Sequence, residues 1–231
     1  MEPIPEVREA ATRLAALADE TLDLVQRLEA VAALAVTLVP SCVGVSITVL
    51  VDDDPFTVTA TSADIASLDA IQYLDGGPCL HAATTDAPVI LDDVLDEPRW
   101  QLYSQAAAAK GVRSSMSLPI RGAGRAPAGA LNLYASDPHA FHGVQSQLAA
   151  LFGVHVGELV ENADLSFMTR EFARELPQRL EDHEHVNQAV GVLMALHTWD
   201  PDQARERIRF AATRAGVTAT EVAKIIMVVG A

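Results

Sequence analysis

The spacing of hydrophobic residues changes twice along this chain of 231 residues, and this change constrains its fold more than any other feature. Between Glu6 and Leu38, apolar residues recur at alternating intervals of three and four, which is typical of a helix with a heptad seam. Between Val43 and Val51, every second residue is hydrophobic, which predicts a half-buried strand. Helical spacing returns at Val144. This order indicates a mixed domain flanked by helices.

Several further strands and short helices are predicted between the two helical regions. A turn at residues 52–55 joins the first strand to a second alternating run, so these two strands should form a hairpin. The other strand-like runs are 89–91, 115–120 and 128–134, the short helices are 65–73 and 103–110, and a loop is expected at 75–78. Strands and helices mixed in this order predict an α/β or α+β domain around an antiparallel sheet.

The C-terminal part of the chain has the pattern of three short helices. The first has apolar residues at helical spacing between Val186 and Leu196. Asp200-Pro201-Asp202-Gln203 forms a capping-box pattern that predicts the start of the second, and Gly216 is suited to its end. Thr218-Ala219-Thr220-Glu221 is another capping box and predicts the start of the third.

The charge of the chain is distributed unevenly. The formal net charge is −15, which by itself argues against a nucleic-acid partner. However, residues 1–169 hold 8 Lys and Arg against 22 Asp and Glu, whereas residues 170–231 hold 8 against 9. The C-terminal part is therefore the one that could tolerate phosphate groups.

Several features of the sequence also indicate the cellular location of the protein. The longest apolar stretch, residues 30–39, is about half the length that a membrane-spanning helix needs. The N-terminus carries Glu6 and Glu9 rather than a basic region before an apolar block, so it does not have the pattern of a signal peptide. Two cysteines, Cys42 and Cys79, make a disulfide framework improbable. We expect a cytoplasmic protein with no membrane association.

Six short segments follow one another between about residues 30 and 160. They are Val43-Gly44-Val45-Ser46-Ile47, Asp69-Ala70-Ile71-Gln72-Tyr73, Gly76-Gly77-Pro78-Cys79-Leu80, Arg99-Trp100, Gly111-Val112-Arg113-Ser114 and Leu131-Asn132-Leu133-Tyr134. Their order resembles that of a GAF domain of the actinobacterial type. GAF domains are sensory modules on an antiparallel sheet, and many bind a small molecule on one face of it. The resemblance implies a sensory domain, with its flanking helices, over residues 1–162, and no cofactor beyond such a ligand.

A second set of segments lies between about residues 178 and 229. They are Gln188-Ala189-Val190-Gly191-Val192-Leu193-Met194, Asp202-Gln203-Ala204, Ile208-Arg209 and Glu221-Val222-Ala223-Lys224-Ile225-Ile226. They resemble an ANTAR module, which binds paired small RNA hairpins and prevents transcription termination. This chain has Val190 where the family often has Lys, so a phosphate contact made elsewhere would be missing here. The resemblance implies an α+β fold class, with a GAF domain, a helical linker over 163–177 and a three-helix ANTAR domain over 178–231.

The expected RNA contacts come from the family motif and from the chemistry of the exposed helix faces. At 100° per residue, Arg205 and Arg209 fall on one flank of the apolar stripe of the second helix, and Arg207 and Arg214 fall on the other. Guanidinium groups offer phosphate a bidentate donor fork, and hydroxyls at a helix N-terminus can donate to phosphate beside its positive end. The resulting candidate residues are Gln188, Gly191, Arg205, Arg209, Arg214, Thr218, Thr220 and Lys224.

The candidate ligand-pocket residues of the GAF-like region are Tyr73, Cys79, Trp100 and Tyr103, for which core packing is the alternative role. Cys79 and His81 lack a second Cys/His pair at metal-ligand spacing, so no metal site is expected. We recognise no catalytic residues and no nucleophile–base motif, and therefore expect a regulator and not an enzyme.

Three functions compete at this level. The first is a signal-responsive antiterminator that binds paired RNA hairpins of a nascent transcript, as a homodimer through the helices flanking the GAF-like region. The second is a DNA-binding regulator with a GAF sensor, because the turn at Gly216-Val217 is close to a helix-turn-helix. The third is an enzyme or redox module using Cys79, which would need an exposed, reactive thiol.

Overall fold

The computed structural model describes residues 24–51, 53–121, 127–150, 152 and 183–230. Its elements, in chain order, are α2 (Leu24–Leu38), β1 (Cys42–Val51), β2 (Asp54–Ala60), α3 (Ala63–Asp75), α4 (Pro78–Thr85), β3 (Val89–Leu91), η1 (Val94–Asp96), α5 (Gln101–Ala109), β4 (Ser114–Arg121), β5 (Pro127–Ala135), α8 (His183–Leu196), α9 (Pro201–Ala215) and α10 (Ala219–Val229). The hairpin, the three further strands and the three C-terminal helices predicted from the sequence are confirmed.

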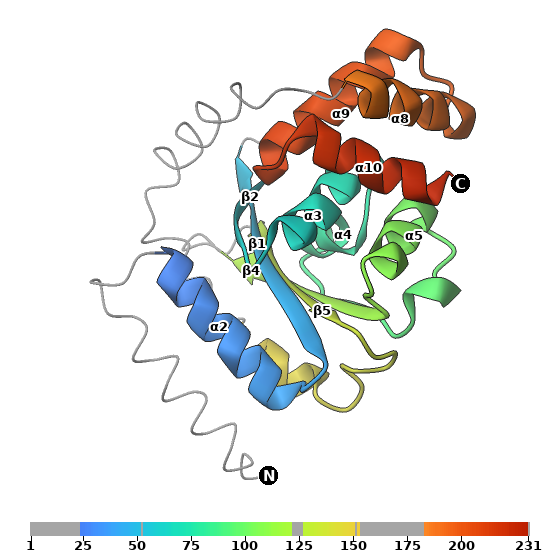
Figure 1. The fold of residues 1–231 in the computed structure, drawn as a ribbon. Coiled ribbons are helices and arrows are strands. Elements are labelled where there is room, and N and C mark those ends of the chain that lie inside the picture. The colour runs from blue at the N-terminus through green and yellow to red at the C-terminus, as the bar shows by residue number, and fades with distance from the viewer. Residues whose placement is uncertain (1–23, 52, 122–126, 151, 153–182, 231) are drawn as a thin grey trace.

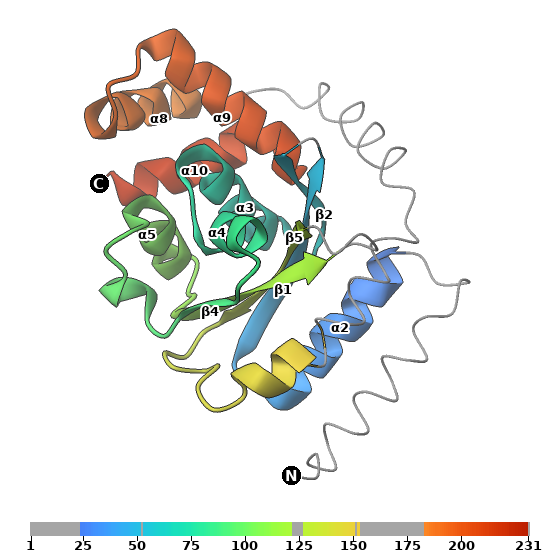
Figure 2. The ribbon, with the colours of Figure 1, turned by 180° about the vertical axis from the view of Figure 1, so that it is seen from behind.

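The strands form one five-stranded antiparallel sheet in the order β2-β1-β5-β4-β3. Helix α2 lies on one face of it, and α3, α4 and α5 lie on the other (Figure 1 and Figure 2). Gly129 of β5 sits where β1 comes closest: it has φ of 156°, and a Cβ there would be 2.0 Å from the carbonyl oxygen of Thr48. Only glycine allows the two central strands to approach in this way.

Both faces of β1 are buried, so the expectation of a half-buried strand was wrong. Val45, Ile47 and Val49 pack into the core under α2, as the alternation predicts. The intervening Ser46 and Thr48 are also 0% exposed, because α3 covers the opposite face. The polar residues of the alternating pattern therefore face a buried polar cluster and not solvent.

Helix α4 was not predicted. The sequence suggested a loop over residues 75–78 and a turn around Cys79, whereas a helix of eight residues begins at Pro78 and buries the Cys79 side chain completely. Proline suits the first position of a helix, since its fixed φ is helical and its missing N–H has no partner there. The two glycines that indicate a loop, Gly76 and Gly77, therefore lie directly before the first residue of α4.

The three C-terminal helices, residues 183–230, form a module that we call the helical module. Both predicted capping boxes are present, at Asp200 with Gln203 and at Thr218 with Glu221, and Gly216 ends α9 in the left-handed conformation. The module packs on the sheet domain, with α9 against α3 and β2 and α10 against α5 and α3 (Figure 1). Residues of both parts, such as Ile208 of α9 and Leu68 of α3, belong to one continuous hydrophobic cluster.

The described part of the N-terminal seam packs within the chain. Val31 and Ala35 of α2 are 0% and 1% exposed and belong to the core beneath the sheet. The seam before residue 24, and most of the helical pattern that begins at Val144, lie outside the described residues.

Candidate functional site

A cluster of buried polar side chains surrounds Asp69 on the face of the sheet that α3, α4 and α5 cover (Figure 1). Its Oδ1 accepts hydrogen bonds from Tyr134 Oη at 2.7 Å and Ser46 Oγ at 3.0 Å, and its Oδ2 accepts from Thr57 Oγ1 at 3.0 Å. Asn132 Nδ2 lies 3.4 Å from Asp69 Oδ1. Helix α3 therefore brings one carboxyl group to three different strands, and the sheet supplies its hydrogen-bond donors.

Burial dominates the electrostatics of this carboxyl group. Desolvation raises the pKa of Asp69 from 3.8 to about 6, although the hydrogen bonds from Tyr134, Ser46, Thr57 and Asn132 act in the opposite direction. The Asp69 carboxyl group thus changes protonation state in a range of pH that ordinary aspartates do not reach. It was not among the residues selected from the sequence, since one Asp within a helical pattern carries no signal of its burial.

Three of the four candidate ligand-pocket residues lie in or beside this cluster. The hydroxyl groups of Tyr73 and Thr57 are 2.7 Å apart, and Cys79 Sγ lies 3.2 Å from Asn132 Nδ2. Tyr103 is 1% exposed, and among the described residues its hydroxyl has no hydrogen-bond partner. The fourth candidate, Trp100, is partly exposed, with the guanidinium group of Arg99 4.2 Å from its ring centroid.

The Cys79 thiol is not suited to redox chemistry. It is 0% exposed, and burial raises its pKa to about 12, so it remains protonated at neutral pH. The other cysteine, Cys42, belongs to the core on the opposite face of the sheet. Because a thiolate is the reactive form, this arrangement argues against the third of the functions considered above.

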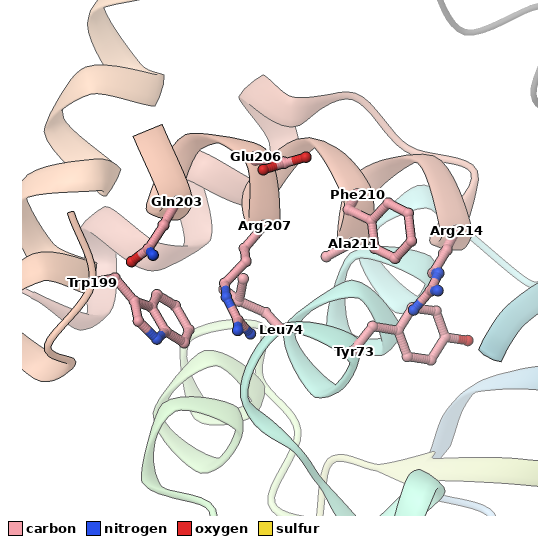
Figure 3. Close-up of a pocket in the computed structure, with 9 residues that line it drawn as sticks. All are labelled: Tyr73, Leu74, Trp199, Gln203, Glu206, Arg207, Phe210, Ala211 and Arg214. Carbon is pink, nitrogen blue, oxygen red and sulfur yellow. The ribbon is translucent and has the colours of Figure 1, made fainter. Parts of the chain in front are cut away.

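A second site lies where the helical module meets the sheet domain. A cavity of about 530 Å³ lies beside the contact between α3 and α9 and is lined by residues of both helices. Tyr73, Trp199 and Phe210 provide aromatic surface, and Arg207 and Arg214 provide guanidinium groups (Figure 3). The sequence predicted two arginine-bearing flanks on α9. The flank with Arg207 and Arg214 faces the sheet domain, and the flank with Arg205 and Arg209 is the other one.

Four of the candidate RNA-binding residues are exposed. They are Gln188 and Gly191 of α8, Arg209 of α9 and Lys224 of α10. A Cβ at Gly191 would meet no atom within 4 Å, so the surface beside α8 is open at this point. Val190 is only 4% exposed, because it packs in the core of the module.

The other candidate RNA-binding residues are partly buried and form contacts within the protein. Arg205 binds Asn187 at 3.0 Å and Asp202 at 3.1 Å. The Arg214 side chain is 10% exposed and forms an ion pair with Asp54 of β2. The hydroxyl of Thr218 is 2.8 Å from Glu221 Oε2 in the capping box, and Thr220 is partly exposed at the start of the same helix.

Two family models match the chain, one in each of its two parts. A family model described as a GAF domain matches residues 11–161, and a model of the ANTAR domain matches residues 174–227. The chain belongs to the GAF domain family and carries a C-terminal ANTAR domain. GAF domains are sensor modules and ANTAR domains are RNA-binding antitermination modules, so the combination is a regulatory architecture.

Solved structures show the same fold for the GAF domain. One described as the structure of a GAF domain aligns with a TM-score of 0.50 at 14% identity, covering 66% of this chain and 86% of that one. The reduced form of fRMsr of Staphylococcus aureus aligns with a TM-score of 0.52 at 16% identity, covering 69% and 99%. At such identities, these likenesses show the fold alone. No curated protein sequence matches the chain.

Among the helices that the structure describes, none is both long enough and apolar enough to cross a bilayer. Besides Asp69, the sequence analysis missed the residues of the contact between the GAF and ANTAR domains, above all Trp199, Phe210 and Asp54. A sequence signal for such a contact is the presence of two large aromatic residues, one just before α9 and one within it.

Proposed function

We propose that this protein is a signal-responsive RNA-binding regulator that acts by transcription antitermination on paired RNA hairpins. The observation that carries the proposal is the ANTAR match over residues 174–227, together with the capped three-helix module in the same part of the chain. The hairpin target and the response to a signal are our inference from the two domain types.

The RNA-binding surface would be built from the exposed candidates on all three helices. Arg209 and Lys224 offer charge for phosphate, and Gln188 and Gly191 mark the part of α8 that lies away from the GAF domain. Arg205 would join them by exchanging Asp202, a partner that is 97% exposed, for a phosphate group. With a near-neutral module, two copies are needed for tight binding, so we propose a homodimer.

Regulation would act through the contact between the domains. Arg214 is held against Asp54 in the docked arrangement, and it can reach RNA only when α9 moves away from α3. A signal bound by the GAF domain would then shift the population between docked and released ANTAR domains. The dimer contact would lie elsewhere than Val31 and Ala35, which are already buried within the chain.

A gel-shift panel tests the proposal, with RNA carrying two hairpins, RNA carrying one hairpin, and duplex DNA, each across a salt series. We expect the two-hairpin RNA to bind most tightly. Preference for duplex DNA would replace the proposal with a DNA-binding regulator. Equal binding of one and two hairpins would remove the paired mechanism and leave general RNA binding.

The double variant Arg205→Ala with Arg209→Ala tests the surface itself. It should weaken RNA binding and flatten its dependence on salt, because each lost phosphate contact lowers counterion release. Arg121→Ala is a matched control, since Arg121 is an arginine of β4 paired with Asp86 of the GAF domain. Unchanged affinity in the double variant would exclude this face of α9.

A further inference from the structure

The cavity between α3 and α9 is distinct from the polar cluster around Asp69, although the two meet at Tyr73. The hydroxyl of Tyr73 lies 2.9 Å from Thr48 Oγ1 within the cluster, whereas the side chain also lines the cavity. A volume of about 530 Å³ is in the range of small-molecule sites, which often lie between domains. The residues that line the cavity determine which ligand chemistry it accepts.

Arg214 supplies the first indication. Its side chain is 10% exposed, its Nη2 pairs with Asp54, and its guanidinium carbon lies 3.7 Å from the ring centroid of Phe210. Its Nε–H is buried and has no hydrogen-bond partner among the described residues. An unpaired donor on a buried, charged group is costly, so the site is suited to an acceptor that arrives with a ligand.

Arg207 supplies a second donor on the same side of α9. Its guanidinium group lies 4.3 Å from the ring centroid of Trp199, which is stacked on His197 at 4.0 Å. Figure 3 shows Arg207 and Arg214 extending from α9 on either side of Phe210, above Leu74 and Tyr73 of α3. Two guanidinium groups therefore border an apolar floor and an aromatic wall.

The acidic groups nearby do not occupy this floor. Glu206 lines the cavity but is exposed and lies on α9 above Arg207 in Figure 3, and Asp54 is 53% exposed beside Arg214. Apart from Glu206 and the neutral Gln203, the lining residues are apolar, aromatic or cationic. This arrangement fits a ligand with one acidic group and a flat apolar body.

We propose that this cavity binds a small aromatic carboxylate. The carboxylate accepts from Arg214 Nε, the ring lies against Phe210, Leu74 and Tyr73, and Arg207 adds positive charge on the other side of Phe210 (Figure 3). Such a ligand contacts both domains at once, so it stabilises the docked arrangement of α9 on α3 by binding only to that arrangement. The site requires no RNA, and its failure or success is independent of the proposed function.

Calorimetry on the full chain tests the proposal with 2-naphthoate and its neutral amide, 2-naphthamide, as probes. We expect one molecule of 2-naphthoate to bind per chain, and 2-naphthamide to bind at least about tenfold more weakly, since it lacks the charge-assisted hydrogen bonds. 2-Naphthoate should also raise the Tm. Absence of binding, or equal affinities for the acid and the amide, overturns the proposal.

Variants locate the site. Arg207 is exposed, so Arg207→Gln should keep the fold and weaken 2-naphthoate binding about fivefold through loss of a nearby positive charge, whereas Arg121→Gln on β4 should leave it unchanged. Equal losses in both variants overturn the assignment. The chain has two Trp residues, so in a Trp100→Phe background the indole N–H resonance of Trp199 reports on the cavity alone. Binding that does not shift this resonance also overturns the assignment.

Discussion

The protonation of Asp69 should leave a measurable mark on stability. The perturbation is Asp69→Asn, which removes the titrating group and keeps an oxygen that can accept from Tyr134 and Ser46. The new amide N–H would face Thr57 Oγ1, a hydroxyl that can accept as well as donate. The variant therefore isolates the charge of the carboxyl group from its hydrogen bonds.

The magnitude follows from the shift of the pKa of Asp69 from 3.8 to about 6. Between these two values the folded protein retains a proton that the unfolded chain has released, so the free energy of unfolding falls as the pH rises through this window and levels off above it. The full shift corresponds to about 3 kcal/mol, and about 2 kcal/mol of this falls between pH 4 and pH 7. Other groups also titrate, and the comparison with the variant removes their contribution.

Urea unfolding of wild type and Asp69→Asn, followed by circular dichroism at pH 4 and pH 7, measures this difference. We expect the variant to gain about 2 kcal/mol relative to wild type between the two pH values. Asp64→Asn is the control, because Asp64 is on the same helix with a side chain that is 68% exposed. Parallel pH dependence in wild type and Asp69→Asn would show that the pKa of Asp69 is not raised in the folded protein.

Three further variants test other parts of the structure. Gly129→Ala should destabilise the protein by more than about 3 kcal/mol in urea unfolding, since its Cβ would collide with the backbone of β1; a loss below about 1 kcal/mol would contradict the close approach. Thr218→Ala should cost about 1 kcal/mol in the same measurement through loss of the N-cap of α10, and a neutral effect would mean that the cap is not used. Asp54→Asn should tighten RNA binding in a filter assay about fivefold, because a half-exposed ion pair that holds Arg214 in the docked state contributes about 1 kcal/mol. Asp86→Asn removes the same charge elsewhere and should have no such effect, and equal gains in both variants would point to net charge alone.

The local features of this fold can be predicted from the sequence because each depends on residues that are neighbours along the chain. The alternation in β1 and the two capping boxes need only the residues themselves and their immediate surroundings, and all were predicted. Helix α4 was missed because Gly76 and Gly77 have the composition of a loop, and Pro78 can either follow a loop or begin a helix.

The long-range features could not be predicted in the same way. Ser46 and Thr48 look like the solvent side of a strand until α3 is placed above them with Asp69 and Tyr73 as partners. Arg214 looks like a surface arginine until α9 is placed against β2. In each case the deciding contact joins residues that are more than twenty positions apart, and a single sequence does not specify it.

We propose that residues 183–230 form the RNA-binding surface of the protein. Ultraviolet crosslinking of the full chain to a two-hairpin RNA, with the crosslinked peptides identified by mass spectrometry, locates this surface. We expect crosslinks in α8, α9 and α10, including the exposed surface around Gln188 and Arg209. Crosslinks confined to the GAF domain, or none at an RNA concentration that saturates binding, would contradict it.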